Sequence, residues 1–433
     1  MTSISITGAR AIVIDEATER SGDLHIDGGV VADSWSTVTD VVDATGCVVT
    51  PGLVNAHHHL LQTAFRTLPG TRGVTMEHWL PTMAAAYAAS GIDAELCAAA
   101  ASAGLAEALL SGVTTVADHH LTWPSGCDSV AIAEGTTSAA RELGARLVFV
   151  RGSARDDPEE AATSAEAIAT HLVPFGGITD DGLLQVAVGP AGVHSDGPET
   201  FRLLGEVAAK LGLRRRTQAN EKVDVHVARE KYGKRPLDVL EEWGWLAPDV
   251  TLAHLCDVTA SEIERLAASG ITATHAPGCD LPMGWGIAPV QALRSAGVTV
   301  GLGTSGGGSN DAGHLLADAR LALQVAPLAP LNPGTYLSAR NVLGMATAGS
   351  AHGLGRPELG HLRAGAAGDA CVWDVSSVLD AGVADPVAGL LWAAPGRRPR
   401  HVIVGGRVVV RDYQLLTADA RVITTRLSKR VGR

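Results

Sequence analysis

The chain contains 433 residues and carries a formal net charge of −12 at pH 7. This length suits one large barrel with an accessory domain better than a single small core. The negative charge and the lack of a long basic run argue against nucleic acid or an anionic membrane as a partner. No apolar run is long enough to span a bilayer. The densest basic patch, Arg214–Arg216, is interpreted as the solvated end of a strand.

The six cysteines are scattered and include no Cys-x-x-Cys pair, so neither a disulfide framework nor a cysteine zinc site is expected. A secretory signal would place a basic stretch before an apolar segment, and the first residues do not have this pattern. These features together predict a cytoplasmic protein.

Short β segments are predicted in the first 50 residues, where apolar runs alternate with Gly and Asp turns. The runs are Ile4–Ile6, Ala11–Ile14, Leu24–Ile26 and Val38–Val42.

The middle of the chain alternates between strand and helix patterns. Apolar strand candidates end at Val54, Val116, Val150, Val188, Thr217, Ala253, Thr274 and Gly301. Helical stretches with typical caps are predicted at 93–110, 128–143, 157–172, 198–211, 236–243, 259–269, 287–296 and 312–325. Eight such units over roughly 275 residues favour a (β/α)8 barrel. A doubly wound open sheet is the alternative, but it requires a Gly-rich phosphate loop after the first strand, where this chain has His-x-His.

Residues 368–413 again read as β structure, with apolar runs at Asp369–Asp374 and Val402–Val410 and a hairpin turn at Gly405-Gly406. The predicted fold is therefore α/β: a TIM-like (β/α)8 barrel from residues 51–359, with a small β-sandwich domain formed by residues 1–50 and 360–433 of both termini.

Polar side chains are concentrated at the predicted strand ends, which is where barrels place their catalytic groups. They are His57, His59, Asp118, His119, His120, His194, Gln218, Glu221, His254, His275 and Ser305. Because strand side chains repeat every two residues, His57 and His59 point the same way and could bind zinc or a similar ion. Recurrent histidine at successive strand ends indicates one shared site.

Several sequence segments at these strand ends together carry a family resemblance. They are Pro51–His59, Gln62-Thr63, Trp79-Leu80, Gly112–His120, Leu252–His254, Thr274–Pro277, Gly301–Ser305 and Ser309–Asp311. In order and spacing they resemble the amidohydrolase superfamily over nearly the whole chain. The resemblance is greatest to the aminohydrolase branch, which includes 8-oxoguanine deaminase, triazine hydrolases and S-adenosylhomocysteine deaminase.

The resemblance implies a site for hydrolytic C–N cleavage, or deamination, of a small purine-, pteridine- or triazine-like heterocycle. His57 and His59 would be metal ligands of the first strand. The fifth strand of the family adds a histidine followed three residues later by a glutamate, and this chain has Gln218 and Glu221 there. The eighth strand of the family ends in an aspartate that binds metal and takes the proton of water, and this chain has Ser305.

These two departures weaken the expected metal site. An amide oxygen is a poorer ligand than imidazole, and a serine hydroxyl adds no negative charge. The sequence does not establish a cofactor, but it is compatible with a weakly bound zinc or other divalent ion. The preferred hypothesis is an enzyme in which Glu221, His254 and Ser305 do acid–base or nucleophilic work with little or no metal, in a hydrolysis, elimination, cyclisation or isomerisation.

Two alternatives remain: deamination or dechlorination with a weakened or displaced metal, and a heterocycle-binding protein or inactivated variant without turnover. Loss at two ligand positions, with Glu221 and His254 kept, favours a changed chemistry. The expected substrate contacts are Gln62, Trp79, His194, Gln218 and His275. The expected partners are a small heterocyclic substrate and further copies of the chain in a homo-oligomer.

Overall fold

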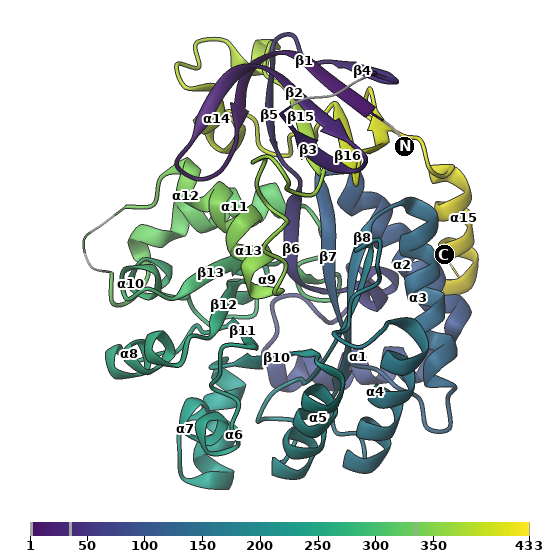
Figure 1. The fold of residues 1–433 in the computed structure, drawn as a ribbon. Coiled ribbons are helices and arrows are strands. Elements are labelled where there is room, and N and C mark those ends of the chain that lie inside the picture. The colour runs from purple at the N-terminus through teal and green to yellow at the C-terminus, as the bar shows by residue number, and fades with distance from the viewer. Residues whose placement is uncertain (1–2, 34–36, 333, 335, 433) are drawn as a thin grey trace.

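The computed structural model describes residues 3–33, 37–332, 334 and 336–432. Its strands form two sheets of nine strands each, one parallel and one mixed. Figure 1 shows the mixed sheet, built from the purple N-terminal strands and the yellow-green C-terminal ones, at one end of the parallel sheet and its helices. The predicted α/β fold class, with a TIM-like barrel and a β unit from both termini, is confirmed.

The mixed sheet joins the two ends of the chain through the antiparallel pair β5 and β15. Its strands are β1 (Ser3–Val13), β2 (Glu19–Asp27), β3 (Val30–Ala32), β4 (Asp40–Asp43), β5 (Cys47–Pro51), β15 (Ala370–Asp374), β16 (His401–Val404), β17 (Arg407–Arg411) and β18 (Gln414–Leu415). The predicted turn at Gly405-Gly406 is confirmed. Both residues have positive φ angles of 53° and 72°, as the hairpin between β16 and β17 requires.

One prediction in this sheet is wrong. The runs Ile4–Ile6 and Ala11–Ile14 belong to one continuous strand, β1, which ends at Val13, rather than to two strands. The pairing of β1 with β2 shifts register around Ala9, next to Gly8 with its φ of 74°. This irregularity lets the strand continue past a residue that reads as a turn in the sequence.

The parallel sheet forms the barrel. Its strands are β6 (Leu53–His59), β7 (Val113–His120), β8 (Arg146–Ser153), β9 (Leu184–Pro190), β10 (Arg214–Ala219), β11 (Val250–His254), β12 (Thr272–His275), β13 (Thr299–Leu302) and β14 (Ser305–Gly306). β13 pairs with β12, and β14, two residues further on, pairs with β6. The last strand therefore returns to the first, which curls the sheet into a TIM-like barrel.

The eight predicted helices are all present within three residues of their expected bounds. They are α2 (Ala94–Leu110), α3 (Ser129–Leu143), α4 (Pro158–Leu172), α5 (Pro198–Leu211), α7 (Pro236–Glu242), α8 (Ala260–Ser269), α10 (Val290–Ser295) and α11 (Leu315–Val325). Their caps act as the sequence indicates. The Asp93, Asp128 and Asp157 side chains accept backbone N–H groups at the starts of α2, α3 and α4.

Several other helices were not predicted. The longer ones are α1 (Met76–Ser90), α6 (Lys222–Tyr232), α14 (Pro386–Trp392) and α15 (Ala420–Val431). The short ones are η1 (Leu60–Phe65), α9 (Pro277–Asp280), η2 (Ala326–Leu328), α12 (Ala339–Gly344), η3 (Met345–Gly349), α13 (Ser350–Gly353) and η4 (Val378–Asp380). α1 contains Pro81, which reads as a helix breaker in the sequence.

The interpretation of Arg214–Arg216 as a solvated strand end is wrong for its last residue. Arg216 is 3% exposed, and its guanidinium donates a hydrogen bond to the backbone carbonyl of Ala56 in β6, within the barrel. Arg215 pairs with Asp249 at 2.6 Å.

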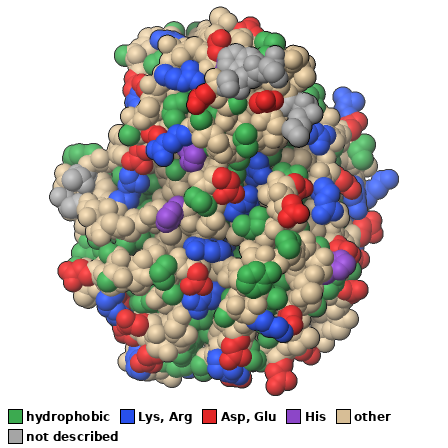
Figure 2. Space-filling model, in the orientation of Figure 1, with side chains coloured by type: hydrophobic (Ala, Val, Ile, Leu, Met, Phe, Trp, Pro, Cys, Tyr) green, Lys and Arg blue, Asp and Glu red, His purple; other side chains and the backbone are tan. Residues whose placement is uncertain are grey.

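On the face shown in Figure 2, basic and acidic side chains are mixed rather than segregated. Within the described ranges, no helix combines the length and apolar character needed to cross a bilayer.

Candidate active site

A cavity of about 730 Å³ lies over the carboxyl ends of the barrel strands. Its polar side includes His59, Asp118, His119, His194, Ser195, Gln218, Glu221 and Ser305. Its apolar side includes Met76, Trp79, Leu80, Met83 and Tyr87 from α1, together with Met283 and Trp285. A volume of this size is in the range of ordinary small-molecule pockets, roughly 300–1,000 Å³.

The cavity brings together most of the predicted site residues. Seven of them line it: His59, Gln62, Trp79, His194, Gln218, Glu221 and Ser305. The other three, His57, His254 and His275, are buried beside it. The His57 ring lies 4.8 Å from the His59 ring, between ring centres, and 5.2 Å from the His254 ring.

His57 and His59 have the character of neutral imidazoles with free lone pairs. His59 Nδ1 donates a hydrogen bond to the backbone carbonyl of His119 at 2.7 Å, which leaves Nε2 without a proton in the neutral ring. His57 Nε2 is buried and has no hydrogen-bond partner among the residues that the structure describes. Burial lowers the pKa of His59 to about 4 and that of His57 well below its usual value. Both rings are therefore suited to accept a cation.

Gln218 occupies the fifth-strand position and is fully engaged by its neighbours. Its Nε2 donates to the backbone carbonyl of Ala191 at 3.1 Å, and its Oε1 accepts from His254 Nε2 at 3.0 Å. The amide therefore has one orientation, with the oxygen toward His254.

Ser305 occupies the eighth-strand position, opposite His58 in the pairing of β14 with β6. Its φ of 54° lies in the left-handed region. The following segment, Gly306–Gly308, is held by two residues that were predicted to contact substrate. Gln62 Oε1 accepts from the backbone N–H of Gly308 at 3.0 Å, and Trp79 Nε1 donates to the Gly308 carbonyl at 3.0 Å. Gln62 and Trp79 thus support the backbone next to Ser305 as well as lining the cavity.

Glu221 is the N-cap residue that precedes α6, and it faces the cavity from a buried position. Its Oε1 lies 3.6 Å from His254 Nε2, while Oε2 has no hydrogen-bond partner within the described part of the chain. Burial raises the pKa of Glu221 to about 7, although the neighbouring His254 opposes this rise. A carboxyl group with a pKa near neutrality can both accept and donate a proton at physiological pH.

His254 ends β11 with a φ of 78°. Its Nδ1 donates to Asp280 Oδ1 at 2.6 Å, and both side chains are completely buried. Burial disfavours the charged ring, but the Asp280 carboxylate outweighs it and raises the pKa of His254 above its usual value. The positive ring in turn holds the pKa of Asp280 at about 2 against its burial.

A second imidazole–carboxylate pair lies near Glu221. His194 Nδ1 donates to Asp224 Oδ1 at 2.6 Å, and the Asp224 side chain is completely buried. Burial opposes the charge on His194, but Asp224 and, to a smaller extent, Glu221 raise its pKa to about 9. The cavity wall therefore carries an imidazolium at neutral pH.

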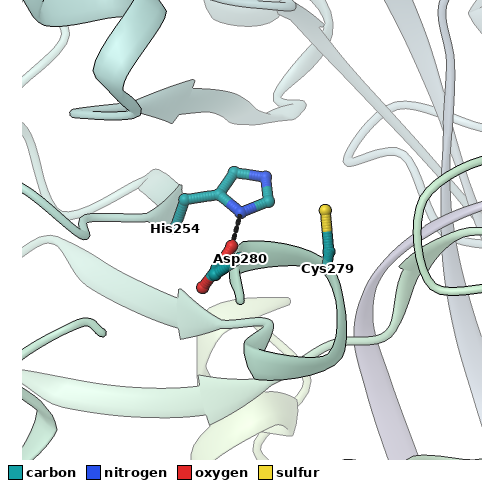
Figure 3. A group of neighbouring side chains, drawn as sticks. All are labelled: His254, Cys279 and Asp280. Carbon is teal, nitrogen blue, oxygen red and sulfur yellow. Dashed lines mark hydrogen bonds and ion pairs between the residues drawn. The ribbon is translucent and has the colours of Figure 1, made fainter. Parts of the chain in front are cut away.

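His254, Cys279 and Asp280 form a compact group of side chains that are common metal ligands, with one donor atom of each within 4.8 Å of the others. Figure 3 shows the Asp280 carboxylate hydrogen-bonded to the His254 ring, with the Cys279 sulfur near this pair. The 2.6 Å contact is shorter than the ~3.3 Å that separates two nitrogen or oxygen ligands on a tetrahedral zinc ion. Burial also raises the pKa of the Cys279 thiol, which favours the protonated form. The arrangement is that of a hydrogen-bonded group.

Asp224, Cys279 and Asp280 were missed by the sequence analysis. Asp224 lies three residues after Glu221, and Asp280 lies five residues after His275. Each lies five residues past the end of its strand, β10 or β12, so a search extended into the following helix would have included both without indicating that they face the site. His275 itself lies 3.5 Å from Asp280, between its Nδ1 and the carboxylate Oδ2.

The family of the chain follows from comparisons with known proteins. The model of the amidohydrolase family matches residues 48–409. The chain therefore belongs to the amidohydrolase family and is an enzyme of the aminohydrolase type.

Its relatives include the 8-oxoguanine deaminase of Pseudomonas aeruginosa, which is 34% identical over 397 residues, covering 89% of this chain and 87% of that protein. The 5-methylthioadenosine/S-adenosylhomocysteine deaminase of Halobacterium salinarum is 34% identical over 427 residues, covering 98% and 96%. The crystal structure of atrazine chlorohydrolase from Arthrobacter aurescens TC1, complexed with zinc, superposes with a TM-score of 0.92 at 34% identity, covering 99% and 100%.

Proposed function

We propose that this protein hydrolyses an exocyclic C–N bond of a small nitrogen heterocycle, using Glu221 and His254 as its acid–base groups and without a tightly bound zinc ion. The observation that carries the proposal is the buried pair at the cavity, with Glu221 Oε1 3.6 Å from His254 Nε2. The substrate class is supported by the relatives, which are named for purine substrates and for the triazine atrazine.

The donor chemistry supports the part of the proposal that concerns metal. At the four positions where the family pattern places ligands, the chain has two imidazoles, one amide oxygen and one hydroxyl, from His57, His59, Gln218 and Ser305. This neutral set would supply no negative charge to a buried divalent ion, at a cost of roughly several kcal/mol. Gln218 is also already bonded to His254 and Ala191. The residues present do not fit a tightly held zinc ion.

The protein's own groups can carry out this reaction. The Glu221 carboxylate takes a proton from water as the water oxygen bonds to the ring carbon that bears the amine. The ring π electrons move to the adjacent ring nitrogen, and the positive charge of His254 stabilises the negative charge that develops there. Glu221 then returns the proton to the amine, the C–N bond breaks, and ammonia leaves with the electron pair. The products are ammonia and the hydroxylated heterocycle.

The test is a panel of amino-substituted purines, pteridines and triazines, offered to untagged protein purified without chelators. Release of ammonia with a matching mass change in the heterocycle supports the proposal. Metal content per chain, measured on the same sample by plasma mass spectrometry, tests the second part. One tightly retained equivalent of zinc would overturn the metal-poor chemistry, whatever the substrate.

The competing function is a heterocycle-binding protein without turnover. It predicts saturable binding of a compound that is recovered unaltered by mass spectrometry. The variant Glu221→Gln separates the two functions because it removes proton transfer while keeping the shape of the site. An enzyme would lose turnover, whereas a binding protein would keep its affinity.

A further inference from the structure

We infer that Asp280 is a positioning residue that, together with Gln218, fixes both ring nitrogens of His254 and so holds this ring at Glu221. The inference rests on the proposed function, because it assigns a purpose to the orientation of His254. It also gives Gln218 a role in orienting His254, whereas the family pattern has a metal ligand at this position.

Asp280 holds one side of the ring. It ends α9, the short helix that follows β12, and its Oδ1 accepts from His254 Nδ1 at 2.6 Å (Figure 3). A contact of this length between an N–H group and a carboxylate is typical of a strong, charge-assisted hydrogen bond. The other carboxylate oxygen, Oδ2, faces His275 Nδ1 at 3.5 Å. Asp280 is completely buried, so the carboxylate has little freedom to leave this position.

Gln218 holds the other side of the ring. Its Nε2 donates to the Ala191 carbonyl, which can only accept, so its Oε1 must be the atom that faces His254 Nε2. An amide oxygen also can only accept, as can an ionised carboxylate. Both nitrogens of His254 therefore act as donors, and the ring is held as an imidazolium whose charge is balanced by Asp280.

The two contacts together determine where the ring points. Rotation of the imidazole would break hydrogen bonds at both nitrogens of a completely buried ring. The edge that carries Nε2 thus stays within 3.6 Å of Glu221 Oε1. Negative charge that develops on a substrate beside Glu221 therefore meets an imidazolium that is already oriented, so the site does not need to reorganise.

Nuclear magnetic resonance of protein labelled with ¹⁵N-histidine tests the contact without any substrate. Wild-type protein is expected to show two strongly deshielded ring N–H protons, one from the His254–Asp280 pair and one from the His194–Asp224 pair. Asp280→Asn keeps the shape of the side chain but removes the charge, and it should abolish the His254 signal alone. Asp224→Asn is the matched control and should abolish the His194 signal alone. Persistence of the His254 signal in Asp280→Asn would overturn the inference.

Kinetics on a substrate of the wild-type enzyme test whether Asp280 acts through His254. Asp280→Asn should lower kcat by about 100-fold, the lower end of typical acid–base contributions, with KM changed less than twofold. His254→Asn should cause a loss of similar size, and the double variant should lose no more than His254→Asn alone. Losses that multiply in the double variant would mean that Asp280 acts independently of His254, which overturns the inference.

Two further measurements cover the remaining outcomes. If Asp280→Asn does not fold, Gln218→Leu tests the opposite side of the ring. Hydrogen exchange at His254 Nε2 should become faster in this variant, and an unchanged rate would contradict the inference.

If no substrate is turned over, the resonance data still decide whether Asp280 contacts His254. Loss of the His254 signal in Asp280→Asn would then support the positioning contact, while the proposed function would fail by itself.

Discussion

Glu221 and His254 are both buried and lie 3.6 Å apart, between the carboxylate Oε1 and the ring Nε2. His254 is tied to Asp280, whereas Glu221 keeps one oxygen without a partner among the described residues. The histidine is therefore the fixed member of the pair, and the glutamate is the member that can exchange a proton with a ligand in the cavity.

We expect Glu221→Gln to lower kcat by roughly 100-fold or more on any confirmed substrate, because the amide cannot transfer a proton. The fold should not lose stability, since the change removes a charge that is costly to bury. Ammonia release and thermal unfolding measure the two effects. Glu262→Gln is the matched control: Glu262 is buried and bonded to Arg235, so this variant should lose stability and keep activity. Full activity in Glu221→Gln would exclude its proposed role.

The stability of the protein should depend on pH through Asp318. Burial raises the pKa of this carboxyl from 3.8 to about 7, although Asn310 and Gly278 donate hydrogen bonds to it. The native state therefore holds a proton that the unfolded chain releases, and this stabilisation is lost as the pH rises from about 4 to 7. The free energy of unfolding of wild-type protein, relative to Asp318→Asn, should fall by up to about 1.4 kcal/mol per pH unit in this window. Parallel curves from denaturant titrations would contradict the prediction.

His194 should titrate near pH 9 in the wild-type protein, because Asp224 raises its pKa against the effect of burial. This pair stabilises the native state fully below about pH 6.5, the usual histidine value, and the stabilisation is lost as the pH rises through about 9. In Asp224→Asn the pKa of His194 should fall by more than one unit. Histidine ¹⁵N shifts followed over pH measure this directly, and an unchanged midpoint would mean that another group supplies the charge.

Restoring the family residues should restore metal binding. In the double variant Gln218→His with Ser305→Asp, the site would carry three imidazoles and a carboxylate, which is a suitable set for zinc. Zinc retained after dialysis should rise from well below one equivalent toward one equivalent per chain. Adding His57→Ala to this double variant should remove the gain. A double variant that still loses its zinc would indicate that the backbone at these positions differs from that of zinc-binding relatives.

Much of the fold could be predicted from periodicity and caps. The eight helices of the middle region were expected within three residues, because Asp93, Asp128 and Asp157 mark helix starts in the sequence as they do in the structure. β1 was split in two because Gly8 reads as a turn when it is in fact part of an irregular strand. α1 was not among the predicted helices, and it contains Pro81, a residue that disfavours the interior of a helix.

The candidate site was predictable where residues lie on strands and less so beyond them. The ends of parallel strands converge in space, so His59, Gln218 and Glu221 could be expected at one cavity. Asp280 and Asp224 could not be assigned in this way, because the directions of side chains after a strand depend on the loop or helix that follows. The orientation of Gln218 toward His254 depends on a carbonyl of another segment, at Ala191, which local patterns do not indicate.

The return of the last barrel strand to the first has a consequence for the order of folding. Ser305 pairs with His58, and Thr304 Oγ1 accepts from Asn55 Nδ2 at 2.7 Å across 249 positions of the chain. Contacts between such distant positions form late, because a long loop must close before they contribute. The pocket therefore cannot be completed by an N-terminal fragment, however well its first strands pair. A chain that has folded only as far as β12 would carry the His57 and His59 imidazoles without the wall that faces them.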